Sequence, residues 1–230
     1  MQDDGNLGGE PGENDNRKAL PQPGKAELAA ALAARVCHDL INPAGAISTG
    51  VDLIEDADKP EMREDAIGLI VESSKKLGVL LPFYRVAFGA SASADTFDVR
   101  KLEEMTRDIY SFQRAELAWD VPFESLGKAA ARTILNLAQL GYLALPRGGV
   151  AKVSARREGG DLVLSVVGEG PKIALKPEVI EGLNGQPMSE GLGGYWVQAY
   201  YLNALLADVG GTVAYAVTET SVALTARLPE

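Results

Sequence analysis

The sequence is organised around Arg35-Val36-Cys37-His38-Asp39-Leu40-Ile41-Asn42-Pro43, which contains the one histidine among 230 residues. Because imidazole chemistry can take place only at His38, a histidine-rich metal site and a pH-sensing histidine cluster are both excluded. Apolar residues recur around it at helical spacing and predict one long helix. His38 lies about 160° from Leu40 on that helix, so we expect the imidazole to face solvent. The apolar stripe consists of Val36, Leu40, Ala44, Ile47, Val51 and Ile54.

The segment His38-Asp39-Leu40-Ile41-Asn42-Pro43, with Ile47 one turn further on, resembles the H-box of two-component histidine kinases, whose histidine accepts a phosphoryl group. A neutral imidazole can attack phosphorus through one ring nitrogen while an adjacent carboxylate, here Asp39, orients the ring and accepts its other proton. Pro43 is expected to bend the helix and make room for an incoming aspartyl-phosphate loop. Cys37 is interpreted as a small, half-buried helix residue rather than as a nucleophile.

Charge and composition exclude several classes of protein. The net charge of −10 argues against a nucleic-acid-binding surface, because few cations are available to neutralise phosphates. The single cysteine excludes an intrachain disulfide and suits a reducing cytosol. No run reaches about 18 apolar residues, and no apolar signal core begins the chain, so we expect a cytoplasmic protein without a membrane span. Residues 1–24 are polar and rich in glycine and proline, and are predicted to be a disordered tail.

Two long helices are predicted to form an antiparallel hairpin, the first over residues 26–56 and the second, after a tight turn, over 61–90. Pro82 is expected to kink the second helix or to end it early, with a further turn or two beyond it. Counting back from the turn places His38 level with about Val79. Because two helices cannot enclose a core, we expect two copies to associate as a homodimer through a four-helix bundle.

A small-residue linker at 91–94 is predicted to separate the hairpin domain, residues 25–92, from a C-terminal domain, residues 93–230. Asp98 and Ser125 are the expected N-caps of two of its helices. Helices on one face of a mixed sheet make an α/β sandwich, so the chain as a whole is predicted to be of the α+β class. The predicted helices are 98–113, 125–145, 177–182 and 195–207, and the predicted strands are 116–121, 151–157, 162–168, 212–218 and 221–228.

The order of these elements resembles the ATP-binding domain of histidine kinases, gyrase and Hsp90-type ATPases. Leu140 stands where that family has the asparagine that holds Mg²⁺, Gly168 where it has the adenine-binding aspartate, and Lys172 where its second ATP box ends in glycine. A leucine offers the metal no oxygen ligand, and a glycine offers the adenine no carboxylate. ATP binding is therefore not expected. The three segments that fall at the positions of the ATP boxes are 136–141, 168–173 and 191–195.

A hairpin with an H-box joined to a degenerate ATPase domain resembles the ChpT-type histidine phosphotransferases of alphaproteobacteria, over residues 26–230. Segments 85–90 and 146–149 also look like that family. The resemblance implies a homodimeric relay in cell-cycle regulation. Such a relay takes a phosphoryl group from the receiver domain of a hybrid histidine kinase and passes it to the receiver domains of response regulators. No cofactor of its own is expected, since the receiver would supply Mg²⁺ and the cationic groups.

Six residues near the H-box are candidates for the site. Asp39 is expected to hold the tautomer of the imidazole, and Asn42 to donate a hydrogen bond near the phosphoryl group or to cap the helix around the proline kink. Arg35 is expected to contact the partner, with pairing to Asp39 at i, i+4 as the open alternative. The predicted catalytic residues are His38, Asp39 and Asn42, and the predicted partner-binding residues are Arg35, Ile41 and Ser48.

Two other functions remain open at this stage. The first is an ATP-dependent histidine kinase with a degenerate nucleotide pocket, which binding of nucleotide with Mg²⁺ would distinguish. The second is a non-enzymatic dimeric adaptor whose hairpin docks a receiver domain while His38 takes no part. Receiver binding without a labelled histidine would favour the adaptor.

Overall fold

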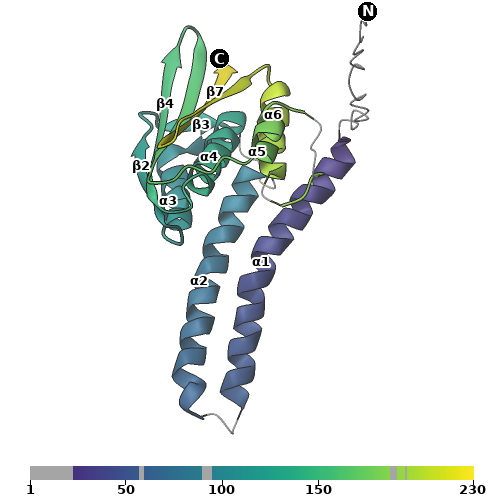
Figure 1. Ribbon diagram of the computed structural model, residues 1–230, viewed down its shortest axis with the longest axis vertical. Coiled ribbons are helices and arrows are strands. Elements are labelled where there is room, and N and C mark those ends of the chain that lie inside the picture. Colours follow the sequence, from purple (N-terminus) through teal and green to yellow (C-terminus); the bar gives the residue numbers. More distant parts are fainter. Residues whose placement is uncertain (1–22, 57–59, 90–94, 187–190, 195) are drawn as a thin grey trace, which may run out of the picture.

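The structure is a computed structural model that describes residues 23–56, 60–89, 95–186, 191–194 and 196–230. Figure 1 shows a long helical hairpin that projects from a compact part built of a sheet and shorter helices. The predicted linker at 91–94, the boundary after residue 92 and nearly all of the predicted tail lie outside the described residues. The observed arrangement confirms the α+β class, with an N-terminal hairpin and a C-terminal α/β sandwich.

The hairpin consists of α1 (Lys25–Glu55), a short 3₁₀ turn η1 (Pro60–Met62) and α2 (Arg63–Ala87). Small residues allow the two helices to approach closely. Gly50 of α1 is buried, and a Cβ atom added there would lie 2.6 Å from the side chain of Ile70 on α2. Pro43 is buried inside α1, and in Figure 1 the N-terminal half of this helix diverges from α2.

The last turn of α2 belongs to the core of the C-terminal domain. Pro82 was expected either to kink the helix or to end it early, and the early end is wrong, because α2 continues through it to Ala87. Phe83 and Tyr84, which follow the proline, are only 1 % and 5 % exposed. Their rings lie edge to face, and Phe88 continues the cluster by stacking on Tyr84 and meeting Tyr201 edge-on. Burial of these aromatic rings offsets the backbone hydrogen bond that a proline removes.

A five-stranded mixed sheet forms one layer of the C-terminal domain. Its spatial order is β2-β4-β5-β7-β6, with β2 and β4 parallel and every other neighbouring pair antiparallel. A separate two-stranded ribbon pairs β1 with β3, and the sequence analysis did not predict it. The strands are β1 (Thr96–Asp98), β2 (Ala115–Asp120), β3 (Ser125–Gly127), β4 (Gly149–Glu158), β5 (Asp161–Glu169), β6 (Thr212–Val217) and β7 (Ser221–Pro229).

The helices of this domain are α3 (Val99–Tyr110), α4 (Lys128–Leu143), α5 (Pro177–Leu183) and α6 (Val197–Ala207). The central helix α4 packs against β4, β5 and β7 and is buried along most of its length. Alternate residues of β4, namely Ala151, Val153 and Ala155, are buried under the helices, as the period of a strand requires. On the opposite face Ser154 and Ser165 share a hydrogen bond of 2.9 Å.

The two expected N-caps have different outcomes. Asp98 caps α3, because its side chain accepts hydrogen bonds from the backbone amides of Arg100 and Lys101. Ser125 does not cap α4, since it lies in β3 and the helix begins after Gly127. Among the described residues, no helix combines the length and the apolar character needed to cross a membrane.

Candidate functional site

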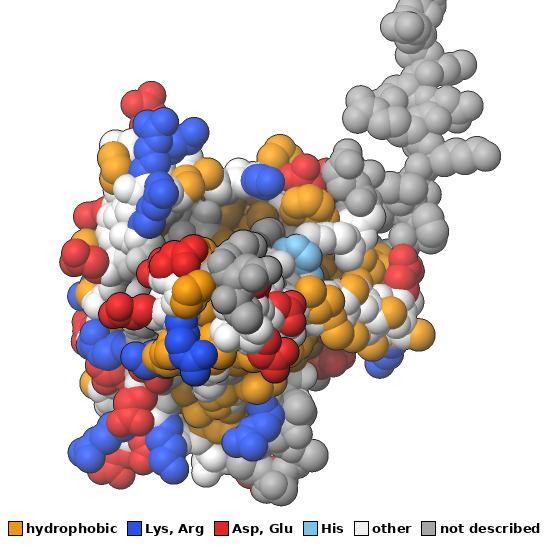
Figure 2. Space-filling model, turned by 90° about the horizontal axis from the view of Figure 1, so that it is seen from below, with side chains coloured by type: hydrophobic (Ala, Val, Ile, Leu, Met, Phe, Trp, Pro, Cys, Tyr) orange, Lys and Arg blue, Asp and Glu red, His pale blue; other side chains and the backbone are white. Residues whose placement is uncertain are grey.

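His38 lies midway along α1 with its imidazole at the surface. The side chain is 65 % exposed, which confirms the solvent-facing orientation predicted from helical phase. Figure 2 shows the ring in pale blue, open to view from the tip of the hairpin and next to hydrophobic side chains. A partner that approaches this side of the hairpin can therefore reach a ring nitrogen directly.

Asp39 contacts the inner nitrogen of that ring. The distance from His38 Nδ1 to Asp39 Oδ1 is 3.3 Å. A carboxylate can only accept a hydrogen bond, so the contact is favourable when Nδ1 carries the proton. In that tautomer Nε2 keeps its lone pair and is the nitrogen free to act as a nucleophile.

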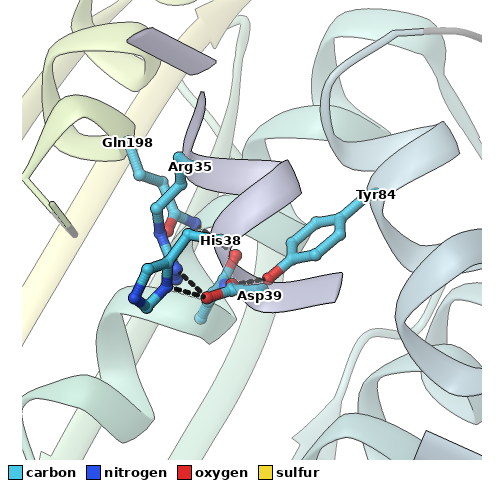
Figure 3. A network of polar contacts seen from close by, with 6 residues as sticks. Arg35, His38, Asp39, Tyr84 and Gln198 are labelled. Atoms are coloured by element: carbon cyan, nitrogen blue, oxygen red, sulfur yellow. Dashed lines mark hydrogen bonds and ion pairs between the residues drawn. The ribbon is translucent and has the colours of Figure 1, made fainter. Parts of the chain in front are cut away.

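The carboxylate of Asp39 is in turn held by two buried donors, as Figure 3 shows. Arg35, one turn earlier on α1, pairs with Oδ1 through Nη1, and the hydroxyl of Tyr84 on α2 donates to Oδ2. Burial, the hydrogen bond to Asp39 and the negative charge of Asp39 together raise the pKa of Tyr84, so the phenol remains a donor. Both carboxylate oxygens are thus engaged, from two different helices.

Arg35 has the partner that the sequence analysis left as an alternative. It was placed among the partner-binding residues, with pairing to Asp39 left open, and the structure shows the pairing. Its side chain is only 3 % exposed because α6 of the C-terminal domain packs against α1. Arg35 therefore offers little surface to a docking protein.

The remaining candidates share the outward side of α1 with His38. Ile41 is 65 % exposed, so its apolar side chain is available for contact on this side of α1. Asn42, one turn after His38, and Ser48 are also exposed, and the Ser48 hydroxyl donates to the carbonyl of Ala44 at 3.4 Å. Cys37 is exposed as well, so its interpretation as half-buried is wrong.

Sequence reasoning missed Tyr84 as a residue of the site. Counting along the helices placed His38 level with Val79, whereas Asp39 meets Tyr84, more than one turn further along α2. The count compared backbone levels, but helical side chains tilt toward the N-terminus of their own helix, so in an antiparallel hairpin Asp39 reaches away from the turn and Tyr84 reaches back toward it. The signal that could have indicated Tyr84 is a polar aromatic residue among the apolar residues Phe83, Val86 and Ala87 of that helix end.

The region that resembles a nucleotide site has an apolar character. Leu140 is 2 % exposed and lines a cavity of about 180 Å³, together with Leu175, Val179 and Trp196. This volume is below the roughly 300–1,000 Å³ of common small-molecule sites. Among the described residues, no group of three or more His, Cys, Asp or Glu side chains is placed to hold a metal ion.

Asn136, the first residue of the first box-like segment, has a structural contact. It is fully buried, and its amide donates to the backbone carbonyls of Ala87 at 3.1 Å and Arg132 at 2.8 Å. Its side-chain oxygen accepts from Gln198 of α6 at 3.0 Å, and Gln198 also donates to Gln139 at 2.7 Å. This network joins the end of α2 to α4 and α6.

Comparison with known proteins agrees with this geometry. Residues 99–221 match the family model described as the histidine phosphotransferase C-terminal domain. The chain belongs to the histidine phosphotransferase family. It is 30 % identical over 205 residues to the protein phosphotransferase ChpT of Brucella abortus (strain 2308), an alignment that covers 87 % of this chain and 95 % of that protein.

Solved structures resemble this histidine phosphotransferase over most of its length. A 1.7 Å structure of a bacterial phosphotransferase matches it with a TM-score of 0.80 and 27 % identity, covering 91 % of this chain and all of the other. The histidine kinase AdeS of Acinetobacter baumannii gives a TM-score of 0.46 at 15 % identity, over 84 % of this chain and 97 % of that one. The resemblance to a ChpT-type phosphotransferase, inferred from the H-box and the degenerate ATP boxes, is confirmed.

Proposed function

We propose that this histidine phosphotransferase carries the phosphoryl group on His38 in a bacterial multistep phosphorelay. The group arrives from the receiver domain of a hybrid histidine kinase and leaves to the receiver domains of response regulators that control the cell cycle. The observation that supports this most is the one histidine of the chain, 65 % exposed on α1, with Nδ1 turned to Asp39 and Nε2 open to a partner.

The chemistry is a reversible transfer between two nucleophiles. His38 Nε2 attacks the phosphorus of an aspartyl phosphate in line, an N–P bond forms, and the P–O bond to the receiver carboxylate breaks with its electron pair. The imidazole gains positive charge, which the adjacent carboxylate of Asp39 stabilises while Nδ1 keeps its proton. In the second half-reaction a receiver aspartate attacks the phosphohistidine, and the neutral imidazole leaves.

The outward side of α1 is the proposed docking surface. Ile41 supplies apolar contact beside His38, Ser48 extends the surface toward the hairpin turn, and Asn42 is placed to donate to a phosphoryl oxygen. Mg²⁺ comes with the receiver domain in this proposal, and the phosphotransferase needs no cofactor of its own. Because the net charge is −10, affinity at this surface rests more on apolar packing than on charge.

ATP has no part in the proposed reaction. Support comes from Leu140, which is buried in an apolar wall where the kinase family has a metal-binding asparagine. Gly168, at the position of the adenine-binding aspartate, pairs with Ala151 and Val222 in the sheet and offers no side chain. A nucleotide would find neither a metal ligand nor a charged partner for its base at these two positions.

A homodimer in the cytoplasm is the proposed form of the relay. The hairpin exposes Val51 on α1 and Ile67, Val71 and Leu81 on α2. At about 100° per residue the three side chains of α2 share one lateral face. A second copy of the hairpin would cover this face and complete a four-helix bundle. The exposed thiol of Cys37 suits a reducing compartment.

The test follows acid-labile radioactive phosphate on the purified protein. One reaction supplies a phosphorylated receiver domain, and the other supplies Mg-ATP. We expect label only from the receiver and no label in His38→Ala, which removes an exposed side chain and should preserve the fold.

Three results contradict the proposal. Label that arrives directly from ATP would make the protein a kinase, and intact receiver binding without label on His38 would make it an adaptor. Label retained by His38→Ala would exclude His38 as the carrier.

A further inference from the structure

The most unusual polar cluster in the molecule surrounds Asp39. Its side chain is 14 % exposed and lies between an exposed imidazole and two buried donors, Arg35 and Tyr84. A partly buried carboxylate is stable when charged donors and hydroxyls satisfy it. The donors approach different oxygens, Oδ1 from Arg35 and Oδ2 from Tyr84, so together they define the plane of the carboxylate.

The orientation of that plane determines what His38 meets. Oδ1, the oxygen that pairs with Arg35, is also the oxygen 3.3 Å from His38 Nδ1. If the carboxylate rotated away, the exposed ring could exchange its proton between its two nitrogens through water. Nε2 would then carry the proton in part of the molecules and could not attack phosphorus in them.

We propose that Tyr84 is a positioning residue for phosphoryl transfer, acting with Arg35 to hold Asp39 so that His38 keeps its proton on Nδ1 and presents Nε2. This inference rests on the proposed role of His38 as the carrier. Tyr84 does not touch the reacting atoms, and it acts through Asp39 from the other helix of the hairpin. A residue of α2 thereby determines which ring nitrogen of His38, on α1, is free to attack.

The surroundings of Tyr84 suit this task. The ring is fixed on two sides, by Phe83 edge-on at 5.8 Å and by Phe88 stacked at 5.4 Å between centroids. The residue is 5 % exposed, so water has little access to the hydroxyl that donates to Asp39. A rigid donor restricts the acceptor more than a flexible surface side chain does, because less conformational freedom remains in the pair.

The single histidine makes the test direct. In protein labelled with ¹⁵N-histidine, every imidazole signal comes from His38, and at about pH 8, where an ordinary imidazole is neutral, the two ring nitrogens report the tautomer. We expect the wild-type protein to show a protonated Nδ1 and an unprotonated Nε2. Tyr84→Phe, which keeps the ring and its packing, should shift the signals toward a mixture of tautomers.

Tyr110→Phe is the matched control. Tyr110 is also 5 % exposed, and its hydroxyl donates to the carbonyl of Ala138 at 2.7 Å, inside the C-terminal domain. This variant also loses one phenol hydroxyl from an equally buried tyrosine, but it changes no contact to Asp39. We expect this variant to keep the wild-type tautomer and transfer rate, whereas Tyr84→Phe should slow transfer from a phosphorylated receiver roughly tenfold, as loss of a hydrogen bond to a charged group predicts.

A double-mutant comparison shows whether Tyr84 acts through Asp39. In the background of Asp39→Ala, the further change Tyr84→Phe should leave the tautomer ratio unaltered, because no side-chain oxygen remains for Tyr84 to hold. A wild-type tautomer ratio in Tyr84→Phe, or an additional shift in the double variant, would overturn the inference. Failure of the wild-type protein to take up phosphate on His38 would instead refute the proposed function, while the tautomer measurement would stand.

Discussion

One carboxylate, that of Asp39, receives donors from three side chains on two helices. The side chains differ sharply in depth, with His38 65 % exposed and Arg35 3 % exposed. The acid therefore lies at the border between a reactive surface and a packed interior. Through Tyr84, whose ring stacks on Phe88, the orientation of the exposed imidazole depends on packing at the base of the hairpin.

Two buried tyrosines, Tyr84 and Tyr110, are expected to make the free energy of unfolding decrease at alkaline pH. Burial raises the pKa of Tyr84 and of Tyr110 above the ordinary value of about 10. Because the pKa is raised in the folded state, each tyrosine makes its full contribution to the free energy of unfolding below pH 10. That contribution decreases as the pH rises further, because only the unfolded chain then releases the proton. The expected slope is about 1.4 kcal/mol per pH unit for each tyrosine.

Urea unfolding from about pH 9 to about pH 11 measures this slope. The double variant Tyr84→Phe/Tyr110→Phe should lose the part of this slope that the two phenols contribute. Tyr200 and Tyr201, whose pKa burial also raises, and the titrating lysines contribute equally to both proteins. Equal slopes in the wild-type and double-variant proteins would mean that the two phenols ionise normally in the folded state. Tyrosinate absorbance in the near ultraviolet provides an independent check, since neither phenol should ionise before the protein unfolds.

The sequence predicted those site residues whose place depends on local spacing. His38 and the residues one turn around it follow the period of one helix, so their outward orientation could be derived. Tyr84 could not be derived in this way, because its contact with Asp39 spans 45 positions and depends on how far α2 rises beside α1. The burial of Arg35 depends on α6, which packs there from the far end of the chain.

Among the helices and strands, the secondary structure predicted from local sequence differs from the observed one in α2 and just before α4. Pro82 favours a helix end, yet α2 continues because the next residues are buried among aromatic rings. The ribbon of β1 and β3 escaped prediction because strands of three residues show no alternation that differs from a loop. Ser125, taken for a helix cap, pairs with Asp98 in that ribbon instead.

The apolar face of the hairpin yields a prediction about assembly. Ile67 and Val71 lie one turn apart on α2 and are 47 % and 46 % exposed in the single chain. If a second hairpin covers them, the double variant Ile67→Asp/Val71→Asp buries two charges without partners. We expect the dimer dissociation constant to rise roughly a hundredfold or more, as determined by light scattering during size-exclusion chromatography.

Lys76→Glu is the control for that experiment, because position 76 is exposed and lies about 140–180° from these two residues around α2. It should leave the dimer intact. A wild-type protein that is monomeric at all concentrations, or an Ile67→Asp/Val71→Asp variant that remains dimeric, would place the interface elsewhere or exclude it.

In the whole molecule, hairpin and C-terminal domain share one core rather than meeting at a polar boundary. The buried aromatic residues at the end of α2 pack with α3 and α4, and Asn136 adds a hydrogen bond from α4 to the carbonyl of Ala87. Sequence reasoning separated two domains at a linker and left the role of the second one open. In the structure the C-terminal domain contacts both helices of the hairpin. It covers Arg35 on α1 and packs against the end of α2 that carries Tyr84.

This shared core predicts that Asn136→Ala loosens the base of the hairpin. The substitution leaves the carbonyl of Ala87 and the amide of Gln198 with fewer buried partners, which should lower the free energy of unfolding by about 1–3 kcal/mol. Amide hydrogen exchange in the last turn of α2 should accelerate, because that turn loses a contact to α4. Urea unfolding and exchange mass spectrometry measure the two effects.

Asn203→Ala separates a local loss from a general one. Asn203 donates to the carbonyl of Leu183 at 2.8 Å, a bond between α6 and α5 that does not involve the hairpin. This variant should lose stability while exchange at the end of α2 stays nearly unchanged relative to the rest of the fold. If Asn136→Ala and Asn203→Ala accelerate exchange at the end of α2 equally, the hairpin is not held through Asn136. Selective acceleration in Asn136→Ala would show that this asparagine fixes the hairpin to the C-terminal domain.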